Sequence, residues 1–335
     1  MDVASKQRLW GYDHALDTPF VRGLLVGLAV ILVIVPFCLW LLQVLGKLNP
    51  ERRGELWARY RSWLVITPLI VGPVVLGAAW TIAAVGLMGL LCYREFARAT
   101  GMFRQPAISS LVVLGILAIT FAVADHWYGL FVAITPLMIA VIAAVGICGD
   151  QPKGYIQRVA LGIFAFLLFG VCFGHLAYLA NDTNFRPMLL WLVLCVELND
   201  VFAYLVGKTL GRKKLAPNTS PNKTVAGALG ALVLTTALAA GLGAMVFAGT
   251  RVASPLKLLT LGLIVSIAGQ LGDLTLSSIK RDLGIKDWAA TFPGHGGLLD
   301  RFNSLLFAAP AVFHYVGYLQ GIGLNQVPRI ITNGG

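Results

Sequence analysis

Ionisable side chains are scarce in this sequence. Only 12% of its 335 residues are charged, and Asp and Glu together number 15. A soluble domain carries roughly a quarter of charged residues, so this shortage excludes an ordinary soluble globular domain. Apolar side chains make up 58% of the chain, which indicates a polytopic membrane protein.

Cysteine is also rare, and its spacing carries no metal or disulfide pattern. The chain has five Cys, and none of them form a CxxC pair. A zinc site on paired cysteines and a disulfide framework are therefore not expected. Their positions within or at the ends of apolar runs fit small apolar packing residues. These residues are Cys38, Cys92, Cys148, Cys172 and Cys195.

The first twenty residues lack the features of a removable signal peptide. They contain acids, and no A-x-A-like cleavage site follows a short apolar segment. The net charge of +11 does not predict a nucleic-acid partner. The excess Lys and Arg lie in short loops between apolar runs, where such residues set membrane topology.

Nine apolar runs separate the charged loops. Each is a helix candidate, because an open sheet cannot satisfy its backbone polar groups in lipid. The predicted fold class is therefore all-α, a polytopic transmembrane helical bundle with about nine to ten membrane crossings. The runs are about 24–45, 64–91, 107–124, 127–148, 159–181, 187–207, 224–248, 256–276 and 302–323.

Residues 64–91 decide the number of crossings, because the run is long for one crossing and short for two. A hairpin that returns to its starting side places 19 of the 26 Lys and Arg in loops on one side, against 17 for a single crossing. The positive-inside rule therefore favours the hairpin. The preceding basic, aromatic segment 46–63 is expected to lie flat in the headgroup layer, or to be an ordinary juxtamembrane linker.

Charge of both signs gathers in residues 272–304, around a glycine-rich turn at 293–297. Glycines let backbone N–H groups approach phosphate, Lys and Arg neutralise phosphate, and carboxylates hold a divalent metal. The stretch therefore predicts a site for a charged ligand at the membrane surface, with a plain cytoplasmic loop as the alternative.

A second polar group begins inside an apolar run, at Glu197 and Asp200. Intramembrane carboxylates are costly and indicate function by default. These two lie three residues apart, on one face of a helix. The basic loop 207–224 follows and ends in Lys223 and Thr224 at the start of the next run, where a helix N-terminus favours anions. A solvated basic loop is the alternative.

Both groups resemble the phosphatidate cytidylyltransferases (CDP-diacylglycerol synthases). The later group matches that family at Ser277-Ser278-Ile279-Lys280-Arg281, Lys286-Asp287, Pro293-Gly294-His295-Gly296-Gly297 and Asp300-Arg301. The earlier group matches it at Asn199-Asp200, Ala203-Tyr204, Ser220-Pro221, Lys223-Thr224 and Gly227. Three acids that the family usually has are replaced here, by Ala226, Leu276 and Asn303.

The resemblance implies three parts of the chain. Residues 1–60 form an N-terminal extension with one extra span and the amphipathic segment, residues 61–323 a membrane-embedded cytidylyltransferase domain, and residues 324–335 a tail. It also implies transfer of a cytidylyl group from CTP to phosphatidate, giving CDP-diacylglycerol and pyrophosphate for phospholipid biosynthesis, with Mg²⁺ as cofactor in a one- or two-metal site.

By the same resemblance the metal ligands are Asp200, Asp273 and Asp300. The catalytic residues are these three together with Lys280, Arg281 and Arg301. The substrate-binding residues are Asn199, Tyr204, Ser220, Lys223, Thr224, Ser277, Lys286, Asp287, His295, Gly296 and Gly297.

Two other functions stay open. The missing acids favour a sibling nucleotidyltransferase that acts on another membrane phosphate, such as a polyprenyl phosphate. A catalytically weak scaffolding homologue is the third interpretation. The expected partners are CTP, a membrane lipid phosphate and the lipid bilayer, with a homodimer as a further expectation. The expected location is a bacterial cytoplasmic membrane, with loops 207–223 and 277–301 facing one another on the cytoplasmic side.

Overall fold

A computed structural model of the chain describes residues 3–291, 296–321 and 329–332. The described chain is predominantly helical, and every predicted apolar run coincides with one or more helices. The helices are α1 (Val3–Trp10), η1 (Tyr12–His14), α2 (Pro19–Val44), α3 (Pro50–Leu76), α4 (Ala78–Thr100), η2 (Met102–Arg104), α5 (Pro106–Ala124), α6 (Tyr128–Val145), α7 (Tyr155–Phe166), η3 (Leu167–Cys172), α8 (Phe173–Tyr178), η4 (Leu179–Asn181), α9 (Phe185–Leu210), α10 (Val225–Val246), α11 (Pro255–Asp282) and α12 (Leu299–Gln320).

One antiparallel hairpin interrupts the helices of the described chain. Strand β1 (Lys214–Ala216) pairs with β2 (Ser220–Thr224) inside the basic loop. The all-α prediction did not include it. Its turn contains Pro217 and Asn218, which are residue types typical of tight turns.

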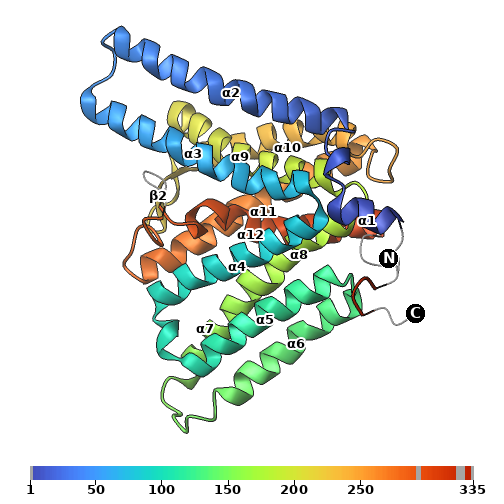
Figure 1. Cartoon of the computed structure of the whole chain (residues 1–335). Coiled ribbons are helices and arrows are strands. Elements are labelled where there is room, and N and C mark those ends of the chain that lie inside the picture. Colours follow the sequence, from blue (N-terminus) through green and yellow to red (C-terminus); the bar gives the residue numbers. More distant parts are fainter. Residues whose placement is uncertain (1–2, 292–295, 322–328, 333–335) are drawn as a thin grey trace.

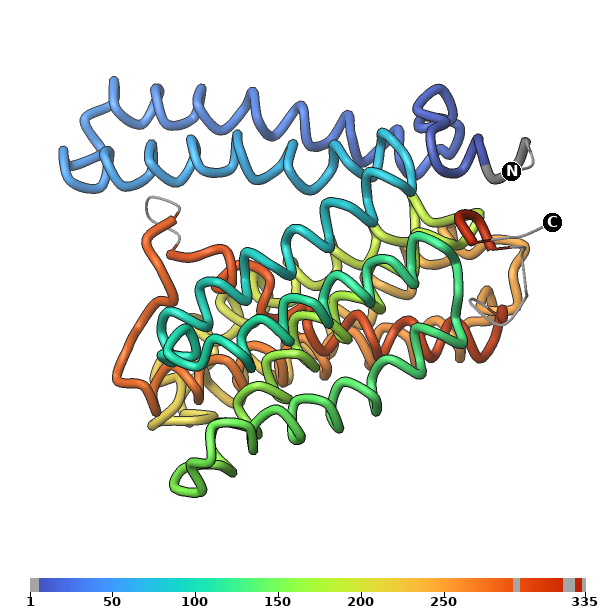
Figure 2. The backbone as a smooth tube through the Cα atoms, turned by 60° about the horizontal axis from the view of Figure 1, so that its bottom comes forward, coloured from blue at the N-terminus to red at the C-terminus, as the bar shows by residue number. Residues whose placement is uncertain are grey.

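Helices α2 and α3 form an antiparallel pair that lies as a separate layer along one side of the bundle (Figures 1 and 2). The Tyr60 hydroxyl of α3 donates to the Leu32 carbonyl of α2 at 2.9 Å. Helix α3 runs without a break from Pro50 to Leu76. Most of the segment 46–63 is thus the first half of this helix, and its place in the headgroup layer stays a prediction.

The run 64–91 turns back at Gly77, where α3 ends and α4 begins (Figure 1). Gly77 has φ of +135°, a conformation that favours glycine. A side chain there would also collide with the Leu9 carbonyl. The two helices run in opposite directions (Figure 1), and whether they form a pair of membrane crossings stays a prediction.

Seven of the described helical segments are long and apolar enough to cross a membrane. Helices α3, α4 and α12 are not among these seven segments. The structure is thus a polytopic helical membrane protein, while the predicted count of nine to ten crossings is not confirmed. The seven segments are Pro19–Val44, Pro106–Ala124, Tyr128–Val145, Tyr155–Asn181, Phe185–Leu210, Val225–Val246 and Pro255–Asp282.

The two ends of the bundle differ. The β1–β2 hairpin and the loop between α11 and α12 meet at one end, and the N-terminal helix and residues 329–332 lie at the other (Figure 1). At this second end Asp125, between α5 and α6, holds the last described residues. Its carboxylate accepts hydrogen bonds from the Ile331 and Thr332 backbone N–H groups at 2.5 and 2.9 Å and from the Thr332 hydroxyl.

We expect Asp125→Asn to destabilise the protein by about 1–3 kcal/mol, because Asn replaces the buried, charged acceptor of three hydrogen bonds with a neutral one. Burial alone would raise the pKa of Asp125, but the hydrogen bonds from Thr332 and Ile331, with nearby Arg329, outweigh it and lower that pKa. The stabilisation is therefore present above the ordinary carboxyl pKa and is lost as the pH falls through the lowered value. Thermal unfolding in detergent measures the change, with the exposed Asp13→Asn as control; equal melting temperatures for both variants would contradict the assignment.

Candidate active site

The site forms where α9, α11, α12 and the β1–β2 hairpin meet. Helix α11 continues past its apolar part and carries Asp273 and Lys280 in its last turns. Helices α11 and α12 approach closely at Gly272, where a Cβ atom would lie 2.7 Å from the Asn303 carbonyl oxygen. Small residues permit such close approach of helices, and here it brings the next residue, Asp273, against α12.

Asp273 is the centre of a first polar cluster, called here the Asp273 cluster: Asp200, Lys223, Asp273, Asn303 and Ser304. The Lys223 ammonium of β2 lies 2.5 Å from one Asp273 oxygen, and the Asn303 amide donates to the other at 2.5 Å. The Ser304 hydroxyl donates to Asp200 of α9 at 3.1 Å. Four elements of the chain thus converge on two carboxylates.

The charges around Asp200 come from these same elements. Asp273, Lys223 and Arg301 act on it electrostatically, and Arg301 acts also on Glu197, one turn earlier on α9. The Arg301 Nε has no hydrogen-bond partner in the described part of the chain. A cationic side chain with spare donors beside accessible carboxylates suits a phosphate ligand.

Asp300 organises a second group, called here the Asp300 cluster: Glu95, Lys280, Trp288, Gly297 and Asp300. One Asp300 oxygen accepts from the Lys280 ammonium at 2.7 Å. The other accepts from the Trp288 and Gly297 backbone N–H groups at 3.0 and 2.9 Å. Both partners of the ion pair are buried.

Glu95 of α4 completes the Asp300 cluster from the opposite side. Its carboxylate accepts from the Leu298 and Leu299 backbone N–H groups at 3.0 and 2.9 Å and from the Thr291 hydroxyl at 2.7 Å. It therefore caps the first turn of α12 in the manner of an N-cap carboxylate, although it comes from a distant helix.

The basic hairpin faces the end of α11, as predicted for loops 207–223 and 277–301. The Thr219 carbonyl accepts from the Arg281 guanidinium at 3.2 Å, and the Thr219 hydroxyl accepts from Ser278 at 3.4 Å. Thr224 caps α10, since its hydroxyl accepts from the Gly227 N–H.

Comparison with known proteins identifies the family of the chain. The sequence model of the Cytidylyltransferase family matches residues 57–319. The chain belongs to this family. The protein YnbB of Escherichia coli (strain K12), which is described as uncharacterised, is 32% identical over 291 residues, covering 84% of this chain and 92% of that protein.

Two phosphatidate cytidylyltransferases are among the relatives of this chain. The one from Synechocystis sp. (strain ATCC 27184 / PCC 6803 / Kazusa) is 34% identical over 287 residues, which cover 76% of this chain and 92% of the relative. The one from Bacillus subtilis (strain 168) is 38% identical over 159 residues, covering 47% of this chain and 58% of the relative. The N-terminal helix α2 precedes the residues that the family model matches.

The structure places the three predicted metal ligands in two different clusters. Asp200 and Asp273 belong to one cluster, whereas both oxygens of Asp300 are used by Lys280 and by backbone N–H groups. No group of three His, Cys, Asp or Glu side chains suited to a metal ion occurs within residues 3–291, 296–321 and 329–332. The expected site with all three carboxylates therefore differs from the observed arrangement.

Asp200 and Asp273 by themselves fit Mg²⁺. This ion is held by one or two protein carboxylates, and substrate phosphates and water complete its octahedron. The Asp200 side chain is exposed, and Lys223 supplies the positive charge that balances Asp273. The donor set is thus suited to a metal that arrives with a phosphate ligand.

The predicted substrate-binding residues have varied positions. Asn199 is buried, and its side-chain oxygen accepts from Thr235 and Ser266, so it joins α9 to α10 and α11. Tyr204 is exposed and has Lys208 over its ring. Ser277 is buried, Ser220 and Gly296 are half-buried, Gly297 belongs to the Asp300 cluster, and Lys286 and Asp287 are exposed. His295 lies outside the described residues.

Two residues of the site were missed by sequence reasoning. Ser304 carried no signal, since a single serine in an apolar run is common. Glu95 did carry one, because it is a carboxylate at the end of an apolar run, in the sequence Tyr-Arg-Glu-Phe at 93–96, and such residues indicate function by default.

We expect Lys280→Met to destabilise the protein by about 3–5 kcal/mol, because it leaves the Asp300 charge buried without its partner. Lys286→Met is the matched control for stability, since Lys286 is exposed six residues later. Thermal unfolding in the absence of CTP measures both. A Lys280→Met variant as stable as the control would show that the ion pair does not hold the loop.

Proposed function

We propose that the protein transfers a cytidylyl group from CTP to phosphatidate, forming CDP-diacylglycerol and pyrophosphate. The observation that carries the proposal is the Asp273 cluster, in which two carboxylates lie together with Lys223 and near Arg301. Family membership and the phosphatidate cytidylyltransferases among the relatives support this choice of nucleotide and lipid.

In the proposed reaction a phosphate oxygen of phosphatidate attacks the α-phosphorus of CTP. A new bond forms between that oxygen and the α-phosphorus. The bond from the α-phosphorus to the oxygen bridging it to the β-phosphorus breaks, and its electron pair leaves with pyrophosphate. The lipid phosphate is already an anion, so no covalent enzyme intermediate is required.

The basic side chains of the site have separate tasks in this proposal. Lys223 and Arg301 neutralise the two phosphates that must approach each other. Arg281, exposed at the end of α11, binds the departing pyrophosphate together with Lys286. Asp300 and Glu95 do not touch substrate and act as positioning residues that fix the loop and the start of α12.

Asp200 and Asp273 would hold Mg²⁺. When bound, this ion supplies neutralisation of phosphate charge and orientation of the nucleotide. Asn303 and Ser304 orient the two carboxylates through the hydrogen bonds described above.

The proposed orientation places the end of the bundle that carries the β1–β2 hairpin and the α11–α12 loop in the cytoplasm, where CTP is found. The charge count puts 19 of the 26 Lys and Arg on one side of the membrane when 64–91 is a hairpin, and segments rich in Lys and Arg are retained inside. A bacterial cytoplasmic membrane is the proposed location. A homodimer stays a prediction.

One observation favours a second candidate, a sibling enzyme for another membrane phosphate. Asn303 stands where the phosphatidate enzymes resembled by this chain usually have Asp, and it contacts Asp273 directly. A side chain in direct contact with Asp273 is therefore altered, and this change can affect which acceptor is used.

The test of function is incubation of the purified protein with labelled CTP, Mg²⁺ and a panel of acceptors. The panel contains dioleoyl phosphatidate, undecaprenyl phosphate and no lipid. CDP-dioleoylglycerol with release of pyrophosphate is the expected product. Product from undecaprenyl phosphate alone would favour the second candidate over the proposed function. No product from any acceptor would refute both.

We expect Asp273→Asn to lower turnover about a hundredfold or more, because it removes charge stabilisation worth several kcal/mol. Asp282→Asn, an exposed acid at the end of the same helix, is the matched control and keeps near-normal turnover. Thermal stability confirms folding of both variants. If Asp273→Asn keeps near-normal turnover with an unchanged Mg²⁺ requirement, Asp273 is not part of the active centre.

We expect Asn303→Asp to bind Mg²⁺ several-fold more tightly, because a third carboxylate joins Asp200 and Asp273. Titration of activity with Mg²⁺ measures this as a lower half-saturating concentration. Asn303→Ala is the matched control, which loses the hydrogen bond to Asp273 without adding charge. An unchanged or higher Mg²⁺ requirement for Asn303→Asp would show that position 303 does not contact the metal.

A further inference from the structure

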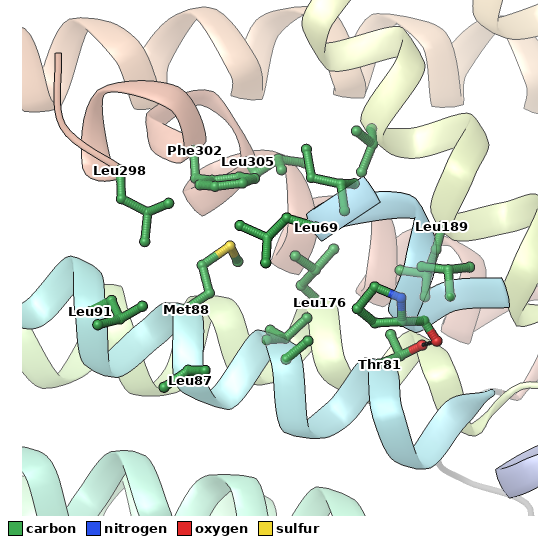
Figure 3. Close-up of a pocket in the computed structure, with 16 residues that line it drawn as sticks. Leu69, Thr81, Leu87, Met88, Leu91, Leu176, Leu189, Leu298, Phe302 and Leu305 are labelled. Atoms are coloured by element: carbon green, nitrogen blue, oxygen red, sulfur yellow. Dashed lines mark hydrogen bonds between the residues drawn. The ribbon is translucent and has the colours of Figure 1, made fainter. Parts of the chain in front are cut away.

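Two apolar cavities lie against the α2–α3 layer. The first, between α3, α4, α8, α9 and α12, has an empty volume of about 740 Å³ and is lined almost entirely by apolar side chains (Figure 3). The second, between α2, α3 and α9, has about 810 Å³ and is equally apolar except for one carboxylate. Ile70 and Val193 line both, so the cavities share a wall.

Each cavity adjoins the charged site. In the first, Leu298, Phe302 and Leu305 line one face of α12 (Figure 3). These positions recur at four and three residues and so share a helix face. Asn303 and Ser304, on the same two turns, point instead to the Asp273 cluster.

In the second cavity the carboxylate is Glu197, which lies one turn before Asp200 on α9. Arg301 acts electrostatically on both of these acids. The second cavity is thus lined by an acid on which Arg301 acts, and the first is lined by Phe302, the residue next to Arg301. The site thus combines one charged region with two apolar cavities.

We propose that the two cavities hold the two acyl chains of the acceptor lipid, one chain in each, while its phosphate lies at Arg301 and Lys223. This inference rests on the proposed function and specifies its substrate as a two-chain lipid phosphate. Each CH₂ group of the chains that leaves water favours binding, and the positive charges of Arg301 and Lys223 complement the phosphate. A single-chain polyprenyl phosphate would leave one cavity without an occupant.

The α2–α3 layer then has a part in choosing the acceptor. Leu24 and Leu28 of α2 line the second cavity, and Leu69 of α3 lines the first. Helix α2 lies before the residues matched by the family model, so part of the hydrocarbon site comes from outside the shared family core. The charged residues that would handle CTP all come from α9 to α12 and the hairpin between them.

The experiment fills each cavity separately. Leu69→Trp enlarges a side chain in the first cavity and Leu28→Trp one in the second. Val65→Trp, on an exposed position of α3 that lines neither cavity, is the matched control. CDP-lipid formation is measured with dioleoyl and with dihexanoyl phosphatidate for all three variants and the unmodified protein.

We expect each cavity variant to lower kcat/KM for the dioleoyl acceptor about tenfold relative to the dihexanoyl one. This corresponds to displacement of about two methylenes from each chain site. Val65→Trp keeps the ratio of the unmodified protein. If both cavity variants keep that ratio too, the acyl chains lie elsewhere and the inference is overturned.

A binding measurement without CTP separates this inference from the proposed function. Dioleoyl phosphatidate should raise the melting temperature of the unmodified protein and of Val65→Trp, and raise it less for Leu69→Trp and Leu28→Trp. This pattern in a protein that forms no CDP-lipid would refute the proposed function and support the two chain sites. Equal stabilisation of all four proteins, none at all, or stronger stabilisation by undecaprenyl phosphate would refute the chain sites.

Discussion

The buried carboxylate of Asp300 is the contact on which the arrangement of the site depends. A charge taken out of water must be paired and hydrogen-bonded to be tolerated, and Asp300 meets this need with Lys280 and two backbone N–H groups. Those partners belong to the end of α11 and to the loop before α12. Satisfying one charge therefore fixes how α11 and α12 meet, and with it the approach of Asp273 to Asn303.

Glu95 adds a second constraint on the same loop from the far side of the bundle. Its hydrogen bonds to Leu298 and Leu299 reach across about two hundred positions of sequence. The two acids thus hold opposite sides of the segment that enters α12. Glu95 and Asp300 are buried and bonded to protein N–H groups, to Thr291 and to Lys280, whereas Asp200 is exposed and Asp273 is half-buried.

Much of the fold could be read from the sequence, because apolar runs and loop charge report directly on lipid contact. Counting Lys and Arg favoured a reversal of the chain within 64–91, and the structure has a turn there at Gly77. The meeting of loops 207–223 and 277–301 followed from their shared chemistry. The division of the acids could not be read in this way. Whether Asp300 faces Lys280 or a metal depends on the rotation of α12 about its axis, and the contribution of Glu95 depends on a long-range contact that no local pattern encodes. The structure also distinguishes the three positions at which an acid of the family is replaced. Leu276 is packed in the core, and Ala226 lies in the first turn of α10. Of the three, only Asn303 is hydrogen-bonded to Asp273.

The α2–α3 layer has an evolutionary consequence. It packs along the side of the bundle (Figure 2) and contributes none of the residues of the Asp273 or Asp300 clusters. Substitutions in α2 can therefore accumulate without disturbing the catalytic apparatus. A membrane enzyme built in this way can diverge toward new hydrophobic substrates by drift in one peripheral helix, while selection keeps its nucleotide chemistry unchanged.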